Sequence, residues 1–157
     1  MAEPDFEELL RSFNKHRVRY CVVGGYAVAF HAIPRYTKDM DILIEPSLEN
    51  GRRVIQALTT FGFGGLHLQP EDFAMPGRVI QLGYEPLRVD LVTSIEHCTF
   101  EQVSKHRVRG KYGNQPTAFI GREELIRNKT SVGRPQDEAD VKMLRSKRKA
   151  GRKRPSK

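Results

Sequence analysis

The chain has little of what marks several large classes of protein. Its 157 residues include only two cysteines, Cys21 and Cys98, which provide neither a disulfide framework nor a CxxC metal-binding pattern. No apolar run approaches the ~18 residues of a membrane-spanning helix. The acidic opening sequence MAEPDFEELL also lacks the apolar segment of a signal peptide. We therefore expect a cytoplasmic domain with no membrane partner.

Common nucleotide- and metal-binding motifs are also missing. Gly24-Gly25 has no third glycine at the spacing of the dinucleotide-binding GxGxxG motif, and no GK[ST] follows it as in a P-loop. The five histidines are scattered, and His97-Cys98 has no partner pair at zinc-ligand spacing. The segment DMDILIE, from Asp39, lacks the turn glycine of a calcium-binding loop.

The positive charge is concentrated at one end of the chain. The formal net charge is +8, but eight of the 27 Lys and Arg residues lie in the last thirteen positions, 145–157, which contain no acid. The rest of the chain has as many basic as acidic residues, so the net charge alone does not indicate an electropositive groove. We expect residues 1–145 to form one domain and residues 146–157 a disordered tail. The tail either binds RNA or another polyanion, or only raises solubility.

Apolar periodicity predicts alternating helices and strands along the domain. One amphipathic stripe, with Phe6 and Phe13 at its ends, has the i, i+3, i+4, i+7 spacing of a helix. Gly113-Asn114 is a favourable hairpin turn, and Pro135 suits the first position of a helix. The predicted helices span residues 4–15, 26–32, 47–61, 99–105, 123–132 and 135–145. The predicted strands span residues 18–23, 40–44, 78–82, 87–93, 108–112 and 117–120.

The segment Tyr20–Glu45 carries the strongest chemical signal. Alternate residues of a strand point to the same face, so Asp39 and Asp41 should project side by side while Met40 and Ile42 point into the core. Adjacent carboxylates repel each other and are costly to bury without a cation between them. Mg²⁺ prefers oxygen ligands and suits such a pair.

Two further features point to chemistry on a nucleotide. Gly24 and Gly25 lie where backbone N–H groups at a helix start can receive a phosphate. A third carboxylate, Asp90, stands in the later strand LRVDLV, where Arg88 shares its face. Three carboxylates on neighbouring strands match the needs of two-metal phosphoryl transfer.

These residues carry a family resemblance. Val23-Gly24-Gly25, thirteen further residues and then DMDI resemble the hG[GS]…Dh[DE]h signature of the DNA polymerase β-type nucleotidyltransferases. The sequence GGYAVAFHAIPRYTKDMDILI and the later block ELIRNKTSVGRPQDEADVKML are similar to small bacterial members related to toxin–antitoxin and abortive-infection proteins.

The resemblance implies an α/β (α+β) fold: a mixed, twisted sheet flanked by helices, with two C-terminal helices. It also implies an NTP donor and Mg²⁺, or Mn²⁺ in its place. By residue, it implies that Asp39 and Asp41 bind metal and that Gly24 and Gly25 hold phosphate. It also implies that Asp90 is the third carboxylate, which acts on the incoming hydroxyl and shares in binding metal.

The roles of several other residues are left open by the sequence. Arg35 either reaches the triphosphate or forms a surface salt bridge. Lys129 is either a nucleotide contact, as the resemblance implies, or a solvated helical lysine. We expect structural roles for Asp137, Asp140 and His31. The basic run KHRVRGK, residues 105–111, either lines a substrate groove or is an exposed hairpin.

Two functions follow as hypotheses. The first is an Mg²⁺-dependent enzyme that moves an NMP unit from an NTP to a hydroxyl of an RNA 3′ end, a protein side chain or a small molecule. The second is a non-catalytic nucleotide- or RNA-binding module that acts with a cognate partner protein in a toxin–antitoxin-like pair. A weaker third hypothesis is RNA binding driven by the tail.

Overall fold

The fold is built on one mixed sheet. The computed structural model describes residues 2–62, 67–84 and 87–152, with side chains as far as residue 146. Its sheet has six strands in the order β3-β4-β2-β1-β6-β5. The strands are β1 Tyr20–Val23, β2 Asp39–Ile44, β3 Val79–Tyr84, β4 Leu87–Val92, β5 Val108–Tyr112 and β6 Gln115–Phe119.

Strand direction follows from the connections. β1 and β2 are antiparallel, as are the hairpin pairs β3–β4 and β5–β6, whereas β2 runs parallel to β4 and β1 parallel to β6. A parallel pair needs a long crossover, and the segment between β2 and β4 contains α3 Leu48–Phe61, the short 3₁₀ helix η2 Pro70–Phe73 and strand β3. The two central strands, β1 and β2, are therefore covered by neighbours on both sides.

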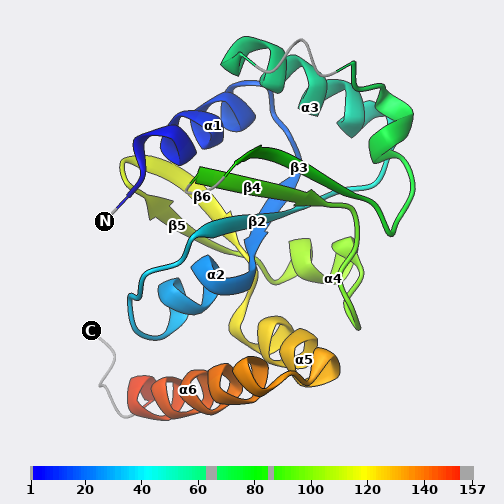
Figure 1. Cartoon of the computed structure of the whole chain (residues 1–157). Helices are drawn as coiled ribbons and strands as arrows, with labels where there is room; N and C mark the ends of the chain where they lie inside the picture. Colours follow the sequence, from blue (N-terminus) through cyan, green and yellow to red (C-terminus); the bar gives the residue numbers. More distant parts are fainter. Residues whose placement is uncertain (1, 63–66, 85–86, 153–157) are drawn as a thin grey trace.

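Helices cover both faces of the sheet (Figure 1). α1 Pro4–Lys15 and α3 pack together on one side. On the other side lie α2 Gly24–His31, α5 Arg122–Val132 and α6 Pro135–Arg152, which contact one another, and also α4 Phe100–Lys105. The buried side chains of α1 and β2 form much of the core, and Phe6, Phe13, Met40 and Ile42 are at most 2% exposed. No described helix is both long enough and apolar enough to cross a membrane.

The predicted elements largely match this architecture. Ser47 caps α3 by accepting a hydrogen bond from the Asn50 N–H at 3.1 Å, and Gly62 ends that helix in a left-handed conformation, as expected. Gly51 lies inside α3 because a side chain there would overlap the backbone of Pro70 in η2. The turn between β3 and β4 was predicted over residues 83–86, of which 85 and 86 lie outside the described residues.

Several predicted boundaries were wrong, most of them by one or two residues. The helix expected to start at residue 26 starts at Gly24, and the strand expected from residue 40 starts at Asp39. The last helix was expected to end at Arg145, but it continues to Arg152. The added residues are mostly Lys, Arg and Ala, which are good helix formers, and basic side chains are favourable near a helix C-terminus. The division of the chain into a domain and a tail at residue 145 stays a prediction.

Candidate functional site

The three predicted carboxylates meet on neighbouring strands. β2 and β4 pair in parallel so that Asp41 lies opposite Asp90, and Asp39 lies opposite Arg88. On its other side, Asp41 lies opposite Val23, the last residue of β1 before α2 begins. The register therefore places the carboxylates at the point where the chain turns from β1 into α2.

The alternation of β2 sets the direction of its side chains. Met40 and Ile42 are fully buried, whereas Asp39 and Asp41 are partly exposed. In β4, Val89 is likewise buried and Asp90 is partly exposed. Because the period of a strand is two, hydrophobic burial of the alternate residues forces the carboxylates onto one shared face, as the sequence predicted.

Burial and the neighbouring carboxylates change the acidity of Asp41. Burial, reinforced by the charges of Asp90 and Asp39 and opposed more weakly by those of Arg88 and Lys129, raises the pKa of Asp41 to about 6. Oδ1 of Asp39 is buried and has no hydrogen-bond partner among the described residues. Such an oxygen carries a desolvation cost that a bound cation would remove. The residues present therefore fit a divalent cation with oxygen ligands.

An arginine holds the third carboxylate. Arg88 binds Asp90 in a bidentate pair, with Nε 3.1 Å from Oδ1 and Nη2 3.0 Å from Oδ2. Its Nε also lies 4.0 Å from Oδ2 of Asp39. Within residues 2–62, 67–84 and 87–152, no group of three metal-ligating side chains is already gathered as a cluster. The sequence placed Arg88 on the same face as Asp90 but did not indicate that the two would pair.

The glycine turn lies directly against Asp41. Gly24 has φ +68°, and a Cβ there would overlap the Asp41 carboxylate. A Cβ on Gly25 would lie 2.8 Å from Cγ2 of Thr37, whose buried Oγ1 has no partner among the described residues. Only glycine allows this backbone conformation and close approach without strain. The first turn of α2, with its unpaired N–H groups, is thereby placed beside the carboxylates.

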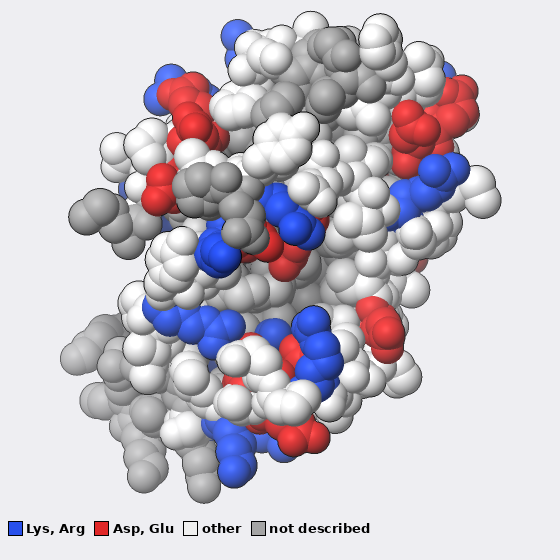
Figure 2. Space-filling model, in the orientation of Figure 1, with Lys and Arg blue, Asp and Glu red and all other residues white. Residues whose placement is uncertain are grey.

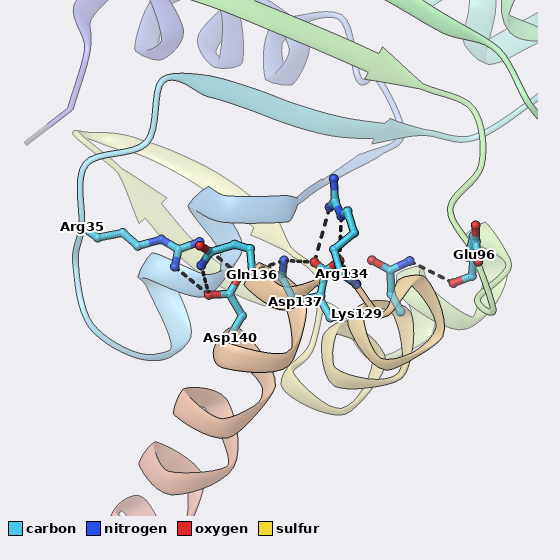
Figure 3. A network of polar contacts seen from close by, with 8 residues as sticks. Arg35, Glu96, Lys129, Arg134, Gln136, Asp137 and Asp140 are labelled. Carbon is cyan, nitrogen blue, oxygen red and sulfur yellow. Dashed lines mark hydrogen bonds and ion pairs between the residues drawn. The ribbon is translucent and has the colours of Figure 1, made fainter.

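A buried ion-pair network lies below this turn, between α5 and α6 (Figure 3). Lys129 Nζ lies 3.0 Å from Oδ1 of Asp137 and 3.0 Å from Oδ2 of Asp140, and its side chain is 8% exposed. Arg35 reaches the same Asp140 from the loop before β2, with Nη1 2.7 Å from Oδ1. Gln136 donates a further hydrogen bond to Asp140 at 2.9 Å. Asp140 therefore links Lys129 to Arg35.

The network resolves several open sequence interpretations. The expectation that Lys129 would be a solvated helical lysine is wrong, because two buried carboxylates draw it inward. Arg35 forms a salt bridge, as one alternative proposed, although its partner Asp140 is fully buried. Burial alone would raise the pKa of Asp137, but hydrogen bonds from Arg134 and Lys129 lower this pKa to about 2. The structural roles expected of Asp137 and Asp140 are confirmed.

Arg134 is a site residue that the sequence did not single out. It precedes α6, is 71% exposed, and donates from Nε to Oδ2 of Asp137 at 2.8 Å. Asp137 raises the pKa of Arg134, and the charge of Asp41 adds to this effect, so the guanidinium lies within electrostatic reach of the carboxylates. Figure 3 shows it directed from the start of α6 toward the sheet. The i, i+3 spacing of Arg134 and Asp137 in the sequence could have indicated this pair.

The face drawn in Figure 2 shows how these charges are arranged. Acidic atoms lie in a hollow between the sheet and the C-terminal helices, with basic side chains on either side of it.

His31 lies apart from this chemistry, with Nε2 2.7 Å from the Ile120 carbonyl oxygen, and burial lowers its pKa. It is a hydrogen-bonded packing residue, as expected.

Comparisons with known proteins address the fold. No protein-family model matches the chain, and no curated protein matches it significantly. Solved structures do match. The antibiotic-resistance factor ANT(2'')-Ia, solved in solution, is 12% identical with a TM-score of 0.58, covering 93% of this chain and 82% of its own. The lincosamide antibiotic adenylyltransferase LnuA is 16% identical with a TM-score of 0.57, covering 93% and 98%. TM1012 of Thermotoga maritima is 14% identical with a TM-score of 0.58, covering 98% and 97%.

The chain has the nucleotidyltransferase fold. The fold class expected from Gly24-Gly25, Asp39-Met40-Asp41 and the C-terminal block is thereby confirmed, including its mixed sheet and its two final helices. The match extends over more than nine-tenths of this chain, so it includes the helices on both faces of the sheet. The narrower likeness to toxin–antitoxin proteins stays a prediction.

Proposed function

We propose that this protein transfers an NMP unit from an NTP to a hydroxyl acceptor and releases pyrophosphate. The observation that carries the proposal is the register of β2 and β4, which brings Asp39, Asp41 and Asp90 together beside the first turn of α2. The likeness to ANT(2'')-Ia and LnuA supports it at the level of fold.

Asp39 and Asp41 would hold Mg²⁺, with Asp90 as the third carboxylate and Mn²⁺ as an alternative ion. The buried, unpartnered Oδ1 of Asp39 and the raised pKa of Asp41 both favour a cation at this point. When bound, the ion would neutralise triphosphate charge and stabilise the leaving pyrophosphate. Ionisation of Asp41, which the other two aspartates oppose, would then become favourable.

The NTP phosphates would lie at the start of α2. The N–H groups of Gly24 and Gly25 belong to its first turn, where the helix dipole favours an anion. The charge of Arg134 interacts with that of Asp41, and its planar guanidinium suits a phosphate. Direct phosphate contacts by Arg35 or Lys129 would require either side chain to leave Asp140, to which both are bound.

The reaction needs a group to take a proton. The acceptor oxygen would attack the α-phosphorus as the bond from that phosphorus to the bridging oxygen breaks, with pyrophosphate leaving. Asp90 would take the hydroxyl proton in this step. Asp90 is bound to Arg88 in the structure, so Arg88 would turn from the carboxylate to the triphosphate as the substrate enters.

A small-molecule hydroxyl is the acceptor that the comparisons favour. ANT(2'')-Ia has been solved with adenylyl-2''-tobramycin and LnuA with lincomycin. The match covers 98% of the LnuA chain, so little of that protein lies outside the part shared with this one. An RNA 3′ end and a protein side chain stay as further acceptor classes for the same chemistry.

The test is a transfer assay with α-labelled NTPs. The protein, MgCl₂ and one NTP at a time are incubated with aminoglycosides and lincosamides, with total RNA, or with lysate, and labelled products are separated from unreacted NTP. We expect label in one acceptor class, loss of transfer in Asp41→Asn, and full transfer in Glu8→Gln, which changes an exposed acid on α1. Transfer that persists in Asp41→Asn would refute the assignment of the site.

The second candidate is a non-catalytic nucleotide-binding module. The observation that favours it is the bidentate hold of Arg88 on Asp90, which withdraws the proposed proton acceptor. In that case NTP binding, measured by calorimetry, should occur without transfer, and a stable partner protein should co-purify. Substitution Asp90→Asn separates the two functions, because it should abolish transfer by an enzyme, whereas a binding module would show no transfer before or after the change.

A further inference from the structure

A second concave site lies away from the carboxylates. It is a groove of about 700 Å³ between the end of α1, helix α4 and the strand pair β5–β6. Four arginines line it, namely Arg17, Arg19, Arg107 and Arg109, and the groove also includes the half-buried ring of Phe100. The lining contains no acidic residue within the described part of the chain. We name this set of residues the arginine groove.

The groove and the carboxylate site lie at opposite ends of β1. Arg19 and Tyr20 stand at the start of this strand, whereas Val23, at its end, pairs with Asp41. Three strand residues correspond to ~10 Å, and the two sites share no lining residue. The arginine groove is therefore separate from the proposed transferase site, and its role does not depend on catalysis.

The four arginines line a common hollow. All four are exposed. Arg19 pairs with Glu45 at 3.0 Å outside the groove lining, and Arg107 donates to the Ser104 carbonyl oxygen at 2.6 Å. Arg17 has φ +57° just after α1, at a position where helices commonly place glycine. Four guanidinium groups around one hollow repel each other, and a bound polyanion would relieve that repulsion.

We propose that the arginine groove binds a single-stranded nucleic acid. Its floor contains apolar surface from Val18, Pro116 and Ala118, which suits the face of a base, and its arginines offer forked donors for phosphates. The volume lies in the ~300–1,000 Å³ range of small-ligand sites, large enough to seat part of a strand. This combination of apolar floor and arginine rim favours nucleic acid over an acidic peptide, whose carboxylates need no stacking surface. It also gives a function to Arg107 and Arg109 of the run KHRVRGK.

The test measures binding of a fluorescein-labelled single-stranded RNA of about 12 nucleotides by anisotropy, with EDTA present to prevent turnover. The full-length double variant Arg107→Ala/Arg109→Ala is compared with Arg11→Ala/Arg52→Ala, which removes two exposed arginines outside the groove. At about 50 mM KCl we expect at least ~10-fold weaker binding for the groove variant and less than ~2-fold for the control. The salt dependence of log Kd should become shallower by about 1.4 for two lost phosphate contacts.

Two further measurements separate binding at the groove from misfolding and from binding elsewhere. In NMR titrations of the unmodified protein, RNA should shift the amide signals of Ser104, Thr117 and Ala118 and leave those of Asp39 and Asp41 in place. Asp41→Asn should bind RNA as tightly as the unmodified protein. The proposal is overturned by equal losses in both double variants, by absence of binding, or by polyglutamate shifting the groove amides where RNA does not.

Discussion

Replacing Asp41 by asparagine should stabilise the metal-free protein near neutral pH. Most substitutions at a site of this kind would be expected to destabilise or to have no effect. Asp41, however, is held against Asp39 and Asp90 at a partly buried position, and its pKa rises to about 6 from an ordinary value of 3.8. Asparagine keeps the shape of the carboxyl group but cannot ionise, so it removes both the cost of burying a charge and the repulsion from Asp90 and Asp39.

The sign follows from proton linkage. Below pH 3.8 both the folded and the unfolded chains hold the proton, and the substitution should change the free energy of unfolding little. Between pH 3.8 and about 6 the unfolded chain ionises first, so the unmodified protein loses stability as pH rises. The full loss corresponds to ~3 kcal/mol. Since solvent still reaches this side chain, we expect Asp41→Asn to gain ~1–3 kcal/mol above pH 7.

The assay is urea unfolding in EDTA at about pH 4 and about pH 7.5, followed by circular dichroism. The difference in unfolding free energy between variant and unmodified protein should grow from near zero to the full gain over this range. Glu8→Gln, on the exposed face of α1, should show no such growth. Saturating MgCl₂ should then reverse the order, because only the unmodified protein retains both proposed ligands and binding stabilises the folded state.

Two results would refute this reasoning. One is a variant that is less stable than the unmodified protein in EDTA at pH 7.5, since the carboxylate would then make a favourable contact. The other is a stability difference that stays constant with pH, because ionisation of Asp41 would not be its source.

Three further changes test other parts of the site. Gly24→Ala should cost ~2–4 kcal/mol in urea unfolding, because the added Cβ would overlap Asp41 and alanine would have to adopt a positive φ. Gly77→Ala, at φ +85° in open space, should cost only ~1 kcal/mol. Equal costs would contradict the close approach of Gly24 to Asp41. Lys129→Met should lower the free energy of unfolding by ~3–5 kcal/mol at pH 7, because two buried carboxylates lose their shared cation. The control Lys142→Met, at an exposed position, should lower it by less than ~0.5 kcal/mol. A similarly small cost for both would show that the network contributes little. Arg134→Ala should raise the KM for the NTP about tenfold, as expected for one charge-assisted phosphate contact, and should lower the melting temperature slightly, because Asp137 loses its hydrogen bonds from Arg134. An unchanged KM, measured where both proteins are folded, would remove Arg134 from the phosphate site.

The sequence determined the local features of this protein. The alternation of Asp39, Met40, Asp41 and Ile42 defined both the strand and the face on which its carboxylates stand. Burial of Met40 and Ile42 on one face requires the two carboxylates to lie on the other. The apolar stripe of α1 and the cap at Ser47 likewise identified helices from short-range spacing alone. Gly24-Gly25 marked the turn into α2, although not that both glycines belong to the helix.

Only the tertiary structure decided which charged groups meet. Asp90 comes opposite Asp41 through the parallel register of β2 and β4, and a register between distant strands is not encoded in either strand alone. Arg35 and Asp140 are 105 positions apart in the chain, and Lys129 is buried because α6 folds back onto α5. Periodicity reports which face of an element is buried. It does not report the partner of an ion pair, because long charged side chains can reach several partners and the packing of whole elements selects among them.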